Sequence, residues 1–141
     1  MSEVFKDNPN IKVVGDRFVF QSEVLFASGS DELGLPGRRE LLKFVNAFKE
    51  LLPRIPRDLD VNIQVQGHTD TDKVVFTDRF ASNWELSAAR ALTVVDFLAD
   101  HGIPQDMLSA AGFGEFAPRV PGDSPEAKAQ NRRIEIRITR R

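Results

Sequence analysis

Hydrophobic and polar residues alternate strictly in two segments of the chain, and this pattern predicts strands with one buried face. The segment 61–66 reads Val-Asn-Ile-Gln-Val-Gln, and the segment 133–138 reads Arg-Ile-Glu-Ile-Arg-Ile. The segment 17–26 is rich in Phe and Val and predicts one strand or a pair of short ones. A further short strand is predicted at 107–113. These segments provide the strands of a sheet.

Hydrophobic residues recur at helical spacing in two other segments. The first helix is expected to begin near Pro36, because proline costs nothing in the first turn of a helix, and to end before Pro53. Its apolar residues lie three or four positions apart, at Leu41, Val45, Phe48 and Leu52. The second helix is expected to begin near Ser82, since Ser82 and Glu85 match a capping box, and to end near His101.

The predicted elements follow the order β-α-β-α-β-(loop)-β, which is typical of an α/β (α+β) sandwich. Helices of this length imply right-handed crossovers onto one face of a sheet. The final strand can pair antiparallel, so we expect a mixed sheet covered by helices on one face. A proline-rich loop occupies 118–125, and a short helical turn is expected at 126–130. We expect residues 1–16 to be a lead-in or linker and residues 17–141 to form the domain.

Composition narrows the classes of protein that the chain can represent. Its 141 residues suffice for one domain with a core, and a formal net charge of -2 gives no reason to expect a nucleic-acid partner. The absence of cysteine excludes disulfides, thiolate metal sites and cysteine catalysis. No apolar run reaches the length of about 18 residues that a membrane-spanning helix needs. No signal peptide opens the chain, so we expect either a cytoplasmic protein or a fragment whose targeting part lies upstream.

Three short motifs carry the candidate chemistry. They are Gly-His-Thr-Asp at 67–70, Asn-Trp-Glu-Leu-Ser-Ala-Ala-Arg-Ala at 83–91 and Asn-Arg-Arg at 131–133. They place an acid and several basic or amide groups at the ends of predicted strands and helices. No nucleophile paired with a base and no set of metal ligands accompanies them. The combination favours a binding pocket for a small charged group over a catalytic site.

With two further blocks, these motifs resemble the signature of the OmpA-like peptidoglycan-binding domain, which also occurs in the stator protein MotB and in peptidoglycan-associated lipoproteins. The further blocks are Phe-Ala-Ser-Gly-Ser at 26–30 and Gly-Phe-Gly at 112–114 followed by Pro118. The resemblance covers about residues 18–139. Spaced blocks in the right order are far more specific than any one of them. The resemblance implies the OmpA-like fold.

The resemblance also implies a function, which is non-covalent binding of the peptidoglycan stem peptide at the free end of its diaminopimelate. Such binding would anchor a cell-envelope protein to the cell wall, without enzyme activity or a cofactor. Asp70 would hold the ligand's ammonium group, and Arg90 its carboxylate. The implied ligand-binding residues are Asp70, Arg90, Asn83, Arg132, Thr69 and Ser87. The implied location is the periplasm or cell envelope, with membrane contact only through a segment outside this chain.

The chemistry of such a ligand suits these residue types. An amino-acid end carries an ammonium and a carboxylate on one carbon, and recognising it needs an anion and a cation a few ångströms apart. The planar fork of Arg90 suits a carboxylate, and the nearby helix N-terminus favours the same group. If Asp70 and Arg90 pair with each other in the empty site, the ligand replaces that pair and the affinity is modest. Many copies of the epitope on a polymer then strengthen the overall attachment through multivalent binding.

The residues next to these motifs have simpler expected roles. Alternation points Arg132 and Arg133 to opposite faces, so at most one of them reaches the pocket, and we expect it to be Arg132. His68 is expected to bond to backbone and orient the loop, because no second histidine lies near it to complete a metal site. Gly112 and Gly114 are expected to be turn glycines.

The chain departs from the family pattern in ways that leave alternatives open. Ala27 stands where the family often has Asp, which removes one polar contact. The loop 71–81 is longer than the commonest spacing, and Trp84 either lines the pocket or packs on the domain. The alternative function is a ligand-free structural or dimerisation domain that associates through the sheet edge or the 71–81 loop. Dimerisation together with wall binding is also left open.

Two further alternatives concern the chemistry of the motifs. Asp70 and Arg90 could form a structural salt bridge that fixes the strand end to the helix. A hydrolase of cell-wall amides would need a nucleophile with a base, or a metal. Ser87 has no histidine at a predictable distance, and His68 with Asp70 lacks a third ligand.

Overall fold

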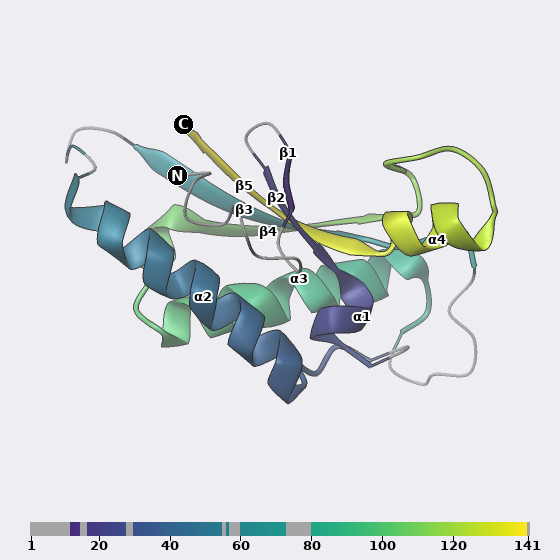
Figure 1. Ribbon diagram of the computed structural model, residues 1–141, viewed down its shortest axis with the longest axis horizontal. Helices are drawn as coiled ribbons and strands as arrows, with labels where there is room; N and C mark the ends of the chain where they lie inside the picture. Colours follow the sequence, from purple (N-terminus) through teal and green to yellow (C-terminus); the bar gives the residue numbers. More distant parts are fainter. Residues whose placement is uncertain are drawn as a thin grey trace.

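The computed structural model has a mixed β-sheet at its centre with helices packed on one face (Figure 1). The residues that the structure describes are 12–14, 17–27, 30–54, 56, 60–72 and 80–140. Within them, the sheet has five strands in the order β1-β2-β5-β3-β4. The strands are β1 (Lys12–Val14), β2 (Arg17–Gln21), β3 (Val61–His68), β4 (Leu108–Gly114) and β5 (Arg133–Arg140). The mixed sheet with helices on one face was predicted, and it is confirmed.

The last strand, β5, lies inside the sheet rather than at its edge. It pairs antiparallel with β2 on one side and with β3 on the other. Strands β3 and β4 pair in parallel. Parallel neighbours need a crossover connection, which helix α3 (Asn83–Asp100) provides. The predicted antiparallel pairing of the final strand is therefore confirmed.

Two long helices, α2 (Leu35–Leu51) and α3, lie on the same side of the sheet in Figure 1. Pro36 occupies the first turn of α2, as predicted. The shorter helical segments are α1 (Ser22–Leu25), α4 (Pro125–Asn131), η2 (Leu52–Arg54) and η3 (Gln105–Met107). The predicted helical turn at 126–130 lies within α4. No helix in the described ranges is long and apolar enough to cross a membrane.

The start of α3 follows from its cap. The side chain of Ser82 accepts a hydrogen bond from the backbone N–H of Glu85 at 3.2 Å. The carboxylate of Glu85 accepts in turn from the backbone N–H of Ala81, also at 3.2 Å. A standard capping box would use the N–H of Ser82 instead, so the reciprocal bond is shifted by one residue. The predicted start of the helix is confirmed.

The structure differs from the sequence prediction in the segment 17–26. This segment was expected to be one strand or a pair of short ones, but β2 ends at Gln21 and the helix α1 follows. The backbone N–H of Ser22 donates to the carbonyl of Arg132 at 3.0 Å. Helix α1 then buries the side chain of Leu25. The expected lead-in at 1–16 includes β1, which pairs antiparallel with β2. The rest of that lead-in lies outside the described residues.

The hydrophobic core lies between the sheet and the long helices. Alternation along β3 and β5 sends Ile63, Val65, Ile134 and Ile136 into it, and each is fully buried. The phenylalanines expected in the core are all buried, namely Phe18, Phe20, Phe26, Phe44, Phe48 and Phe97. The rings of Phe18 and Phe44 meet edge to face at 5.3 Å, a favourable arrangement that joins β2 to α2.

Two strand glycines let α3 approach the sheet closely. A Cβ atom added at Gly67 would lie 2.1 Å from the backbone oxygen of Ser87. A Cβ atom at Gly112 would lie 2.7 Å from the backbone nitrogen of Ala88. Gly112 was expected to be a turn glycine, and this expectation is wrong, because it lies within β4 and serves helix packing. Gly114 does adopt a positive φ of 59°, which favours glycine.

Gly67→Ala is expected to lower the free energy of unfolding by about 1–3 kcal/mol, because the added methyl group meets backbone that cannot rotate away. Urea unfolding followed by circular dichroism measures this change. Gly34→Ala is the matched control, since its added Cβ would make an ordinary contact of 3.6 Å with Pro36. Equal stability of the two variants would contradict the close seating of α3.

Candidate functional site

Asp70 lies at the point where the chain leaves β3, and it is the centre of the candidate site. The preceding backbone N–H, that of Thr69, donates to the carbonyl of Gly114 at 2.8 Å and ties this point to the end of β4. The Asp70 residue is only 7% exposed. Its Oδ1 accepts from the backbone N–H of Asp72 at 3.0 Å, an Asx-type turn that fixes the carboxylate.

The ion-pair partner of Asp70 is Arg132, which lies between α4 and β5. Nη1 of Arg132 donates to Oδ2 of Asp70 at 2.6 Å, and Nε donates to Oε1 of Glu23. Burial lowers the pKa of Arg132, but the hydrogen bonds to Asp70 and Glu23 outweigh it and raise the pKa above its usual value. About a third of the Arg132 side chain stays exposed. Arg132 is therefore a cation that a ligand can reach.

Glu23 is a member of this cluster that sequence reasoning missed. It lies on α1, and half of its side chain is exposed beside Arg132. The segment that contains it was predicted as one strand or a pair of short ones, so its place beside Arg132 was not expected. The signal that could have found it is the polar triplet Gln21-Ser22-Glu23, which separates two apolar runs.

Asn83 and Thr69 shape the backbone around Asp70 rather than presenting free side chains. The amide nitrogen of Asn83 donates to the carbonyls of Asp70 at 3.4 Å and of Asp72 at 2.9 Å. The hydroxyl of Thr69 donates to the carbonyl of Asp70 at 2.9 Å. Both residues are buried. They fix the backbone on which the Asp70 carboxylate is held.

Arg90 does not form an ion pair with Asp70. Its Nε donates to the carbonyl of Ser30 at 2.8 Å, and its Nη2 donates to the carbonyl of Ala27 at 3.2 Å. Its guanidinium carbon also lies 5.0 Å from the centre of the Phe26 ring. Arg90 therefore clamps the loop after Phe26, and Ala27 contributes a backbone oxygen where a side-chain contact was expected to be lost.

Arg90 nevertheless belongs to the same charged cluster. Burial lowers its pKa, Glu23 and Asp31 raise it, and the charges of Arg132 and Asp70 act on it more weakly. Its Nη1 has no hydrogen bond among the described residues. The structure thus brings Asp70, Arg132, Glu23 and Arg90 together, with a different pairing from the one expected.

Ser87 contacts α3 and β4 rather than the Asp70–Arg132 pair. Its hydroxyl donates to the carbonyl of Trp84 and accepts from the backbone N–H of Gly114, each at 3.0 Å. The residue is 1% exposed. Its hydroxyl joins α3 to β4, and its expected contact with the ligand stays a prediction.

Trp84, at the start of α3, packs on the domain surface. Its ring lies 4.7 Å from that of Phe116, and both residues stay more than half exposed.

The residues that follow Asp70 are held by two contacts with residues far along the chain. Lys128 pairs with Asp72 at 2.9 Å, and the Thr71 hydroxyl donates to Asp123 at 3.0 Å. Of the loop expected at 71–81, residues 73–79 lie outside the described residues.

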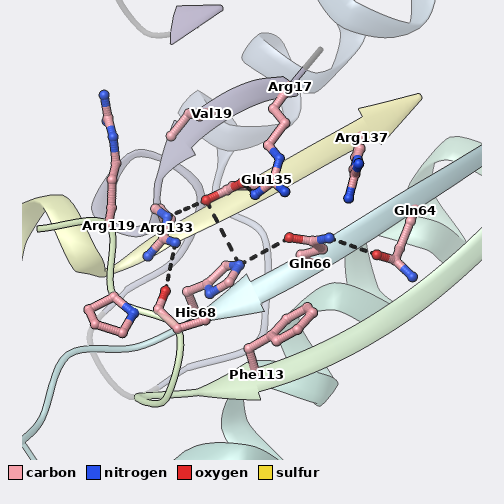
Figure 2. A pocket seen from close by; sticks show the side chains of 12 residues that line it. Arg17, Val19, Gln64, Gln66, His68, Phe113, Arg119, Arg133, Glu135 and Arg137 are labelled. Carbon is pink, nitrogen blue, oxygen red and sulfur yellow. Dashed lines mark hydrogen bonds and ion pairs between the residues drawn. The ribbon is translucent and has the colours of Figure 1, made fainter. Parts of the chain in front are cut away.

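Arg133 and His68 lie on the face of the sheet opposite the helices, and Figure 2 shows them together. Arg133 pairs with Glu135 at 2.5 Å, so alternation has sent Arg132 and Arg133 to different surroundings. His68 stacks on Phe113, and its Nε2 lies 3.3 Å from the side-chain oxygen of Gln66. The expectation that His68 bonds to backbone is therefore wrong. No group of three metal-ligating side chains occurs among the described residues.

Comparison with known proteins gives consistent matches. The sequence model of the OmpA family matches residues 25–132. The crystal structure of a putative MotB like protein from Desulfovibrio vulgaris aligns with a TM-score of 0.86 at 34% identity, over 99% of this chain and 88% of that one. The cell wall anchor of the T6SS from Pseudomonas aeruginosa aligns with a TM-score of 0.81 at 29% identity, over 99% of this chain and 96% of that one.

Among sequence relatives, the peptidoglycan-binding protein ArfA of Mycobacterium bovis is 34% identical over 96 residues, which are 65% of this chain and 28% of that protein. The chain spans half or less of the length of the first curated relatives that it matches.

Proposed function

Because this chain belongs to the OmpA family, we propose that it binds peptidoglycan without covalent chemistry and anchors the protein that carries it to the cell wall. The names of its relatives support this proposal, since they include a peptidoglycan-binding protein and a cell wall anchor. The corresponding location is the periplasm, where the matching domain of the Helicobacter pylori MotB protein is found.

The observation that carries the proposal is the ion pair of Asp70 and Arg132 at the end of β3. Both groups are held by further hydrogen bonds, so their positions are set before a ligand arrives. The pair offers an anion and a cation 2.6 Å apart, with Arg132 partly open to solvent. A zwitterionic amino-acid end can insert here and replace the internal pair with two pairs of its own.

The ligand that fits best is the free end of the diaminopimelate in the stem peptide. Asp70 accepts hydrogen bonds from the ammonium group, and the exposed carboxylate of Glu23 adds a second negative charge nearby. Arg132 donates to the ligand's carboxylate, for which its planar fork is suited. Arg90 supports the same carboxylate with its positive charge while it holds the loop after Phe26.

Affinity for one such epitope is modest in this proposal, because the ligand must break the Asp70–Arg132 bond and displace water before it gains its own contacts. The cell wall compensates by presenting many copies of the epitope, so several domains on one assembly bind together more strongly. The domain acts as a binder rather than an enzyme. Ser87, the candidate nucleophile of the motif, is engaged between α3 and β4.

The test is a titration of the 15N-labelled protein with meso-diaminopimelate. Amide resonances of Asp70, Asn83 and Arg132 are expected to shift in a saturable way. Two ligands of matched chain length serve as controls, namely pimelate without ammonium groups and 1,5-diaminopentane without carboxylates. Equal shifts with all three compounds would refute recognition of a zwitterion, and failure to pellet with isolated sacculi would refute wall binding.

The second candidate is a dimerisation domain without a ligand. It is favoured by β4, which lies at the edge of the sheet and leaves one row of backbone groups without a strand partner among the described residues. Light scattering distinguishes the two functions. A dimer that ignores sacculi supports the second, and a protein that pellets with sacculi in either oligomeric state supports the first.

A further inference from the structure

The face of the sheet opposite the helices carries a pocket of about 580 Å³ (Figure 2). It lies across β2, β5 and β3, whose outward-facing residues are aligned by the pairing register. Glu135 lies between Val19 and Gln66, and Arg137 lies between Arg17 and Gln64. The segment after β4 closes one end. Pockets that bind small molecules have volumes of this order.

The lining of this pocket is strongly cationic, although the chain as a whole carries a net charge of -2. The lining residues that the structure describes include four arginines and one glutamate, an excess of three positive charges. The arginines are Arg17, Arg119, Arg133 and Arg137. Burial lowers the pKa of His68 to about 4, so this ring is neutral near pH 7 and adds no charge. The excess charge is thus concentrated on one open face.

The one carboxylate among the described lining residues does not oppose an incoming anion strongly. Glu135 is paired with Arg17 at 2.7 Å and with Arg133 at 2.5 Å. Burial raises the pKa of Glu135, but these two arginines outweigh it and lower the pKa below its usual value. Glu135 therefore consumes part of the positive charge and fixes two guanidinium groups in place. Arg119 and Arg137 contribute further positive charge beyond that network.

The pocket also contains polar groups that can bond to a ligand. Nδ1 of His68 is buried and has no hydrogen-bond partner among the described residues, an arrangement that costs free energy unless a partner binds. The amides of Gln64 and Gln66 bond to each other at 2.7 Å along the floor. These neutral groups can orient the uncharged part of a ligand whose anion is held by arginine.

We propose that this face is a second binding site, which takes a multiply charged phosphate group carried on a larger molecule. Guanidinium forks match phosphate oxygens, and an excess of three charges favours an anion with more than one negative charge. The volume exceeds what one phosphate fills. The site is separate from the Asp70–Arg132 pair, because neither of these two residues lines the pocket.

The test is isothermal titration of the intact chain with inorganic pyrophosphate at constant ionic strength set by sodium chloride. Saturable binding is expected. In a parallel NMR titration of the 15N-labelled chain, the amide resonances of Gln66, His68 and Arg137 are expected to shift. Arg137→Gln is expected to weaken it about tenfold. Arg119→Gln is a second variant on the loop, for use if the first disturbs the sheet. Arg39→Gln on the exposed side of α2 is the matched control.

Equal weakening by Arg39→Gln, or no weakening by either pocket variant, would overturn the site, because binding would then follow total charge. The source of the phosphate is distinguished by vesicles that contain phosphatidic acid, a lipid whose phosphomonoester headgroup can carry two negative charges. Flotation of the wild-type chain but not of Arg137→Gln indicates a lipid headgroup, whereas pyrophosphate binding without flotation indicates a soluble phosphate. The pocket variants keep their response to meso-diaminopimelate, so the two sites fail or hold independently.

Discussion

Asp70→Ala is expected to weaken binding to isolated sacculi by about 2–5 kcal/mol, the usual cost of truncating one member of a buried, hydrogen-bonded charge pair. The loss has two parts. The ligand's ammonium group loses its acceptor, and the guanidinium of Arg132 loses the oxygen that fixes it at 2.6 Å. The Asx-type bond from the backbone N–H of Asp72 disappears as well, so the backbone that follows Asp70 is held less firmly. Co-sedimentation over a range of sacculus concentrations measures the change.

Asp96→Ala is the matched control for this experiment, because Asp96 is an exposed carboxylate on α3 and lines neither candidate site. The control is expected to bind sacculi like the wild type. Arg132→Ala is expected to resemble Asp70→Ala, and the double variant to be little worse than either, since the two groups act on one ligand. Full retention of binding by Asp70→Ala in a folded protein would exclude the Asp70–Arg132 pair as the wall-binding site.

Acidification is expected to destabilise the fold through His68, by roughly 2–3 kcal/mol between pH 7.5 and pH 4.5. Burial is the main cause that lowers the pKa of His68 from 6.5 to about 4, and the charge of Arg133 lowers it further. In the unfolded chain this histidine takes up a proton near pH 6.5, whereas in the folded chain it does so only near pH 4. Proton uptake therefore stabilises the unfolded state before the folded state, and the free energy of unfolding falls as the pH decreases through that interval.

Urea unfolding of the wild type and of His68→Gln at several pH values measures this effect. The variant should lose less stability than the wild type between pH 7.5 and pH 4.5. His101→Gln removes the other histidine of the chain, which bonds to the carbonyl of Phe97 at 2.8 Å, and should behave like the wild type. Parallel pH profiles for the wild type and His68→Gln would show that His68 titrates normally in the folded protein.

Much of the fold could be predicted from the sequence because the signals are local. Alternation in 61–66 and 133–138 sets which side chains face the core, and the Ser82 cap sets the start of α3. The short helix α1 could not be predicted in this way. Its position depends on the bond from Ser22 to the carbonyl of Arg132, which joins residues far apart in the chain. Likewise, β1 exists only because β2 offers it an edge.

The candidate site could be predicted in part for the same reason. Helix periodicity and strand alternation bring Arg90 and Arg132 near Asp70, but periodicity says nothing about which partner each guanidinium chooses. Arg90 is drawn to the carbonyls of Ala27 and Ser30, whose positions depend on a loop rather than on a repeating pattern. The sheet-face pocket is likewise invisible as a motif, because its arginines come from three separate segments.

The place of β5 inside the sheet has a consequence for how the protein is made. Strand β5 lies between β2 and β3 in the sheet, yet it follows every other described helix and strand along the chain and is therefore synthesised after them. Until then, β2 and β3 are hydrophobic strands with unsatisfied inner edges, the kind of surface on which nascent chains associate wrongly. A message that stops short of Arg133 would therefore yield a product that chaperones and proteases recognise, rather than a weakened version of the native domain.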